Sequence, residues 1–172
     1  MNSISISSKA DLLARTLAML SETVERYDLF ADQMEVVNNP VAEEIFKWLS
    51  KKQSERTAVV EKLVEGEDLP HIPPWDYDWD DAINTSVPGW TSAHYMMTPY
   101  HTLSLAMDVE QSAADFFHQV EQGSNDPALQ KLAHGFAREA ESYRDYLSRE
   151  RRQYPLPEAG WDEDQDPPQL LE

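Results

Sequence analysis

The residues of this chain best suited to chemistry are polar side chains within stripes that are otherwise apolar. Four segments repeat apolar residues three and four positions apart, and these stripes also carry Thr23, Gln53, Arg56, Glu110 and Tyr143. Arginine stays protonated in proteins, and a buried charge needs a charged or hydrogen-bonding partner. We therefore expect Arg56 to pair with Glu110, with the other three side chains completing the hydrogen bonds. The alternative is that these five groups line a hydrated core without forming one network.

The stripes predict four helices that must position these side chains. Their expected limits are residues 8–37, 40–65, 99–122 and 127–153. Three of these helices should begin with a capping side chain followed by proline, at Asn39 and Pro40, at Thr98 and Pro99, and at Asp126 and Pro127. Ser8 and Asp11 resemble a capping box at the start of the first helix.

The links between the expected helices predict the topology. About three residues around Asn38 join the first two helices, and residues 123–126 join the last two, so each pair should form antiparallel neighbours. Residues 66–98 separate the pairs and contain Trp75, Trp79 and Trp90. So many aromatic residues are unusual in a structureless linker, and we expect this segment to pack along the bundle as the long crossover found in ferritin-like bundles.

The predicted fold is therefore all-α, a ferritin-like antiparallel four-helix bundle with a long crossover between helices 2 and 3. A chain of 172 residues suits one domain, which we place at residues 1–153. Residues 154–172 carry six acidic residues, four prolines and no Lys or Arg. That composition predicts an acidic, proline-rich C-terminal tail that is disordered or draped over another surface.

An internal repeat relates the two helix pairs. The recurring features are Leu17-Ala18-Met19 with Leu105-Ala106-Met107, Glu22 with Glu110, and Asn39-Pro40 with Asp126-Pro127. The offset changes by one residue between these features. The pattern indicates that each half of the bundle is a degenerate copy of the other.

On these residues the chain resembles the rubrerythrin-like branch of the ferritin-like superfamily. Each half of that family has a glutamate, an aromatic residue seven positions later, and a second helix that starts at proline and ends in Glu-x-x-His. The second half of this chain matches that framework at Glu110, Phe117, Asp126-Pro127, Leu129, Leu132, Phe136-Ala137 and Glu139. The first half retains Phe30, Asn39-Pro40, Phe46 and Leu49. The resemblance covers the four helices, roughly 120 residues, and neither the crossover nor the tail.

The resemblance also implies where two metal ions would be held, because family members use a carboxylate from each of two helices and Glu-x-x-His from each of the others. The matching positions hold Thr23, Gln53 and Arg56 in the first half and Glu110, Ala140 and Tyr143 in the second. A register shifted by one residue replaces Thr23 with Glu22. Without that shift only Glu110 keeps a family ligand at its matched position, and in either register both histidines are absent. We therefore expect these six positions to be the remnant of a dimetal site, with no catalytic, metal or cofactor residue and no cofactor. The alternative cofactors are Fe or Mn.

The charge limits the possible partners. The chain has a net charge of −18, and no Lys or Arg lies between Lys62 and Lys131. Nucleic acid and anionic membranes are poor partners, because both attract cationic surfaces. A basic protein partner or a cation fits better, and solubility alone is the simpler explanation. The chain contains no cysteine, which removes disulfides, thiolate metal sites and cysteine nucleophiles. It has no apolar signal core and no run long enough for a membrane span, which predicts a soluble cytoplasmic protein.

Other residues give weaker signals. His94, His101, His118 and His134 lack metal-ligand spacing on one buried face, so we interpret them as lone surface histidines. The acidic residues from Asp76 to Asp81 lack the glycine and terminal glutamate of an EF-hand loop. The sequence also lacks a phosphate-binding loop and a nucleophile motif.

Three functional hypotheses follow. The first is a ferritin-like protein without its dimetal site that acts non-enzymatically, by binding or assembly. The second is a diiron or dimanganese oxidoreductase acting on peroxide or ferrous iron. The third is a bundle whose interior holds a small apolar ligand near five alanines, Ala106, Ala113, Ala133, Ala137 and Ala140. We further expect a homodimer formed through the crossover or through the outer face of the first helix pair, including Trp48.

Overall fold

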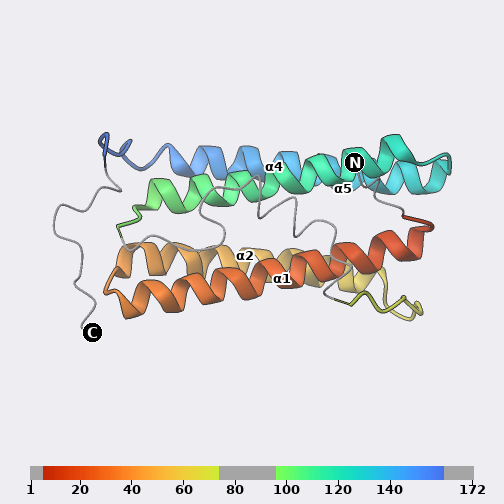
Figure 1. The fold of residues 1–172 in the computed structure, drawn as a ribbon, viewed down its shortest axis with the longest axis horizontal. Coiled ribbons are helices and arrows are strands. Elements are labelled where there is room, and N and C mark those ends of the chain that lie inside the picture. Colours follow the sequence, from red (N-terminus) through yellow and green to blue (C-terminus); the bar gives the residue numbers. More distant parts are fainter. Residues whose placement is uncertain (1–5, 74–95, 161–172) are drawn as a thin grey trace, which may run out of the picture.

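The computed structural model describes residues 6–73 and 96–160 of the chain, and the helices in these ranges form a four-helix bundle (Figure 1). The helices are α1 (Lys9–Val36), α2 (Pro40–Leu63), α4 (Pro99–Gly123) and α5 (Pro127–Arg151), and no strand occurs in those ranges. The predicted all-α four-helix class is confirmed. Each predicted helix end lies within two residues of the observed one.

Local side-chain chemistry explains why the helices begin where they do. The Asn39 side chain accepts a hydrogen bond from the amide of Ala42 at 3.2 Å, and Pro40 occupies the first turn, where its missing amide hydrogen costs nothing. At α1 the Ser8 hydroxyl accepts from the amide of Asp11 at 3.1 Å. The expected capping box differs in its second bond, because the Asp11 carboxylate accepts from the amide of Ser7 rather than Ser8.

The chain folds as two hairpins that pack face to face. Helices α1 and α2 form one hairpin, and α4 and α5 form the other; the contacts within each hairpin far outnumber those between hairpins (Figure 1). Helix α2 ends and α4 begins at opposite ends of the bundle (Figure 1). Residues 74–95 of the expected crossover, with its three tryptophans and Asp76 to Asp81, and residues 161–172 of the tail lie outside the described part of the chain.

One side-chain hydrogen bond connects the loop of the first hairpin to the start of the second. The Asn39 amide nitrogen donates to the carbonyl oxygen of Met97 at 2.9 Å, just before α4. Asn39 therefore caps α2 and also holds the α1–α2 loop against the residue that leads into α4.

Aromatic side chains fill the core of the first hairpin. Phe46 is fully buried, and its ring centroid lies 5.3 Å from that of Phe30 and 6.4 Å from that of Tyr27. Truncating such a buried aromatic residue typically costs about 3–5 kcal/mol. This packing makes α1 and α2 a fixed platform for the polar residues farther along α2. None of the helices described is long and apolar enough to cross a membrane.

Candidate functional site: a buried arginine network

A largely buried ion pair joins α2 to α4. The Arg56 Nη1 donates to Glu110 Oε1 at 2.6 Å, and its Nη2 donates to Glu110 Oε2 at 3.1 Å. The side chains of Arg56 and Glu110 are 16% and 4% exposed. Two parallel bonds from a planar guanidinium to a carboxylate give the strongest geometry for such a pair. The structure thus brings together the two residues that the sequence analysis paired.

Two further residues hold the guanidinium in place. Gln53 lies one turn before Arg56, and its Oε1 accepts from Nη1 at 2.9 Å. The guanidinium carbon of Arg56 lies 4.1 Å from the centroid of the Tyr143 ring, which comes from α5. A cation over an aromatic face is attracted by the electron density of the ring. Arg56 on α2 therefore contacts both helices of the second hairpin.

Arg56 has a fourth partner, Glu139, which was not expected from the sequence. Glu139 Oε1 lies 3.6 Å from Arg56 Nε, and the Glu139 side chain is 51% exposed. It precedes Tyr143 by four residues on α5, so the two side chains share one face of the helix. That spacing was the available signal. Because Glu139 is exposed, its attraction to Arg56 is screened by water and is weaker than that of Glu110.

Two of the expected site residues do not make the hydrogen bonds assigned to them. The Thr23 hydroxyl donates to the carbonyl of Met19 on its own helix at 2.9 Å, which satisfies it locally. Tyr143 contributes its ring face, while its buried hydroxyl has no hydrogen-bond partner within the described residues. Ala140 has no polar side-chain atom and only lines a small cavity beside the ion pair.

Burial and charge also set the protonation of this site. Burial alone would lower the pKa of Arg56, but the attraction and hydrogen bonds of Glu110 outweigh it, so the pKa lies above its ordinary value. Burial raises the pKa of Tyr27 well above the ordinary value, and Glu110 raises it further. Burial likewise raises the pKa of Tyr143, against the opposing effect of Arg56. The site therefore contains a permanent guanidinium cation beside two neutral phenols.

The cavity next to the ion pair has a volume of about 20 Å³. A cavity needs roughly 10–15 Å³ to hold one water molecule, so this one has room for a single water. Only Ala113 and Ala140 of the five alanines named above line it. The hypothesis of an interior pocket for an apolar ligand is therefore wrong for the described structure, because neighbouring side chains fill the space that the alanines leave.

The residues at the six expected dimetal positions do not fit a dimetal site. Both oxygens of Glu110 are bound by Arg56, and a fixed cation at this position repels a metal ion. Nowhere in residues 6–73 and 96–160 do three or more His, Cys, Asp or Glu side chains form a group that could hold a metal ion. Glu22, the ligand in the shifted register, is partly exposed and pairs with Arg26 on its own helix at 3.4 Å.

His101, His118 and His134 each have a polar partner, which corrects the expectation that they are lone surface residues. His101 Nδ1 accepts from the amide of Thr98 at 3.2 Å and so caps α4. His118 Nε2 lies 2.7 Å from Glu141 Oε1 across the α4–α5 seam, and His134 Nδ1 lies 3.1 Å from Glu121 Oε1. The hydrogen bond to Glu141 is the main reason that the pKa of His118 is raised. His94 lies outside the described residues.

Comparison with known proteins gives one informative similarity. No model of a known protein family matches the sequence, and no curated protein matches it. The structure is similar to the crystal structure of an uncharacterized conserved protein from Magnetospirillum magnetotacticum MS-1, with a TM-score of 0.63 and 28% sequence identity. The match covers 88% of this chain and 98% of the other. This chain therefore shares its four-helix architecture with that protein over nearly the whole length of both.

Proposed function

We propose that this chain is a ferritin-like protein of the rubrerythrin-like kind in which an arginine-centred network has replaced the dimetal site. The observation that carries the proposal is the two-bond contact of Arg56 with Glu110 at positions where the family resemblance puts metal ligands. The internal repeat and the similarity to the Magnetospirillum protein support the fold assignment.

The replacement has a simple electrostatic explanation. A dimetal site places cations among carboxylates, and a guanidinium also neutralises carboxylates from inside the bundle. Arg56 satisfies Glu110 directly and attracts Glu139 from the rim. A guanidinium offers no open coordination position and no change of oxidation state. We therefore assign the chain a non-enzymatic role in binding or assembly.

Elemental analysis tests this proposal. Protein purified after growth in iron- and manganese-rich medium should contain well under one tightly bound metal ion per chain. The Glu110→Gln variant is the matched control, because metal bound loosely by the acidic surface remains in it. Two metal ions per chain that disappear in Glu110→Gln would instead support the oxidoreductase alternative.

We further propose that the chain forms a homodimer through the outer face of the first hairpin. Large apolar side chains are exposed there, including Leu29 and Val36 on α1, which are 54% and 85% exposed. These two residues lie seven positions apart and so share one face of α1. Trp48 does not belong to this interface, contrary to expectation, because it faces the second hairpin. The centroid of its ring lies 6.2 Å from that of Tyr146 on α5.

Light scattering at micromolar concentration tests assembly. The monomer mass is 19.7 kDa, so a mass near twice that value is expected. Replacing both Leu29 and Val36 by Asp should return the mass to that of a monomer. Replacing Leu156, an exposed leucine beyond α5, by Asp is the matched control and should leave the dimer intact. A monomeric parent protein would contradict the proposal.

A further inference from the structure

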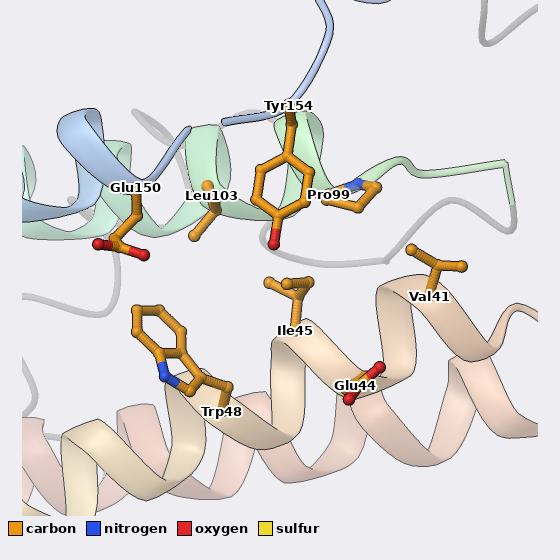
Figure 2. Close-up of a pocket in the computed structure, with 8 residues that line it drawn as sticks. All are labelled: Val41, Glu44, Ile45, Trp48, Pro99, Leu103, Glu150 and Tyr154. Atoms are coloured by element: carbon orange, nitrogen blue, oxygen red, sulfur yellow. The ribbon is translucent and has the colours of Figure 1, made fainter. Parts of the chain in front are cut away.

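A second site lies at the end of the bundle where the α1–α2 loop meets the start of α4. A cavity of about 420 Å³ opens there between α2 and the second hairpin (Figure 2). The described residues that line it are Val41, Glu44, Ile45, Trp48, Pro99, Leu103, Glu150 and Tyr154. The volume falls within the range of about 300–1,000 Å³ that is typical of small-molecule sites.

The floor of this cavity is apolar and aromatic. Leu103 is buried on α4, and Ile45 and Trp48 are half-buried one turn apart on α2. Tyr154 follows α5, and its hydroxyl points down into the cavity toward Ile45 (Figure 2). The Trp48 ring also packs against the Tyr146 ring of α5, with the ring centroids 6.2 Å apart. The aliphatic part of a ligand could therefore replace water against Leu103 and Ile45.

Two carboxylates stand on opposite sides of this floor. Glu44 projects from α2 and Glu150 from the last turn of α5, with the Glu150 carboxylate above the Trp48 ring (Figure 2). Glu150 accepts a hydrogen bond from the Gln153 side chain at 3.1 Å, and neither carboxylate forms an ion pair within the described residues. No Lys or Arg is among the described lining residues.

The charges around the cavity decide which ligand it can take. The N-termini of α2 and α4 border it, and each contributes about half a positive charge, while the C-terminus of α5 contributes about half a negative charge. Adding the two carboxylates leaves a net charge of about −1.5. An anion is therefore disfavoured. A neutral apolar ligand would leave both carboxylates unpaired.

We propose that this cavity binds an aliphatic polyamine, a ligand with two or more ammonium groups joined by methylene chains. The ammonium groups would pair with Glu44 and Glu150, and the methylenes would pack on Ile45 and Leu103. The Trp48 and Tyr154 rings add the attraction of aromatic faces for a cation. The proposal concerns a site separate from Arg56 and Glu110, so it stands or fails independently of the replaced metal site.

Calorimetric titration of the full chain with spermidine in 0.15 M salt tests the proposal. Saturable binding of one spermidine per chain is expected. Hexylammonium should bind more weakly, and 1,6-hexanediol should not bind. Glu150→Gln and Glu44→Gln should each weaken binding by about fivefold, the upper range for a partly exposed charge pair. The double variant should lose about 25-fold if the two carboxylates act independently.

Two matched controls separate this site from general attraction to an acidic protein. Glu61→Gln removes the same charge from an exposed position elsewhere on α2, and Asp162→Asn with Asp164→Asn removes charge from the C-terminal residues. Both should change the affinity by less than twofold. An equal loss in either control, or no saturable binding, would overturn the proposal.

A spectroscopic measurement locates the bound ligand. The indole N–H resonance of Trp48 can be assigned by its absence in Trp48→Phe. Spermidine should shift this resonance in the parent protein and much less in the Glu44→Gln/Glu150→Gln variant. Binding that leaves the Trp48 resonance unmoved would place the polyamine elsewhere and refute the assignment.

Discussion

The replacement of Arg56 by Met is the sharpest perturbation of the central network. It leaves the Glu110 carboxylate buried with 4% of its side chain exposed and removes both hydrogen bonds that satisfied it. Breaking a buried ion pair by removing one partner typically destabilises a protein by about 3–5 kcal/mol. The variant also loses the Gln53 hydrogen bond and the Tyr143 contact, so the upper part of that range is reasonable.

Proton uptake limits the cost and gives it a pH dependence. A glutamate in an unfolded chain titrates near pH 4.3, so protonating it at pH 7 costs about 3.7 kcal/mol. The stranded carboxylate can take up a proton in the folded variant instead of staying charged. Protonation becomes easier as the pH falls, by about 1.4 kcal/mol per pH unit. Together with the lost Gln53 and Tyr143 contacts, the deficit of the variant should therefore be about 4–5 kcal/mol at pH 7 and about 1–2 kcal/mol at pH 5.

A double-mutant cycle measures the interaction itself. Urea unfolding followed by circular dichroism should show that Arg56→Met with Glu110→Gln recovers at least about 2 kcal/mol of the sum of the single losses, because the double variant buries no charge at this site. Single losses that add to within about 0.5 kcal/mol, or a deficit in Arg56→Met that is equal at pH 5 and pH 7, would refute the reasoning.

Two other contacts give further expectations. Asn39→Ala removes the α2 cap and the hydrogen bond to Met97 and should cost about 1–2 kcal/mol in urea unfolding. Asn39→Asp keeps the cap acceptor, loses only the Met97 bond and should cost less; no loss in Asn39→Asp would mean that the Met97 bond contributes nothing, and equal losses would mean that the cap contributes nothing. His118 faces Glu121 on α4 and Glu141 on α5; His134 also contacts Glu121, and Arg138 also contacts Glu141. An NMR titration should therefore give His118 a pKa above the ordinary value of 6.5, and Glu141→Gln should lower that pKa. Because folding raises that pKa, the contribution of His118 to stability is fully present below about pH 6.5 and is lost as the pH rises through the folded value. A His118 titration that is unchanged by Glu141→Gln would contradict the assigned role of Glu141.

The sequence was a good guide to the helices because their signals are local. A capping side chain and a proline determine each start at Pro40, Pro99 and Pro127 within a few residues, whatever the tertiary structure is. The pairing of Arg56 with Glu110 was also predictable, since a charge on each of two inward stripes leaves few other solutions.

The errors came from competition between local and distant partners. Thr23 lies on the expected stripe, but the carbonyl of Met19 is always within reach of its hydroxyl, so no distant partner is needed. Trp48 was assigned to the outer face although it precedes the buried Leu49 by one residue and follows Ile45 by three, which places it at the edge of the inner stripe. The polyamine site joins residues from α2, α4 and the end of α5, and no periodicity in one helix could have indicated it.

The arrangement as two hairpins has a consequence for how the chain folds. Each hairpin is built from helices that are neighbours in sequence, whereas the Arg56–Glu110 and Asn39–Met97 contacts join residues 54 and 58 positions apart. Local contacts form early in folding, and contacts that close long loops generally form later. The hairpins should therefore form first and then dock, with the guanidinium reaching its carboxylate in the docking step. Removing that ion pair should consequently accelerate unfolding much more than it slows folding, so that the pair acts mainly on the lifetime of the docked bundle.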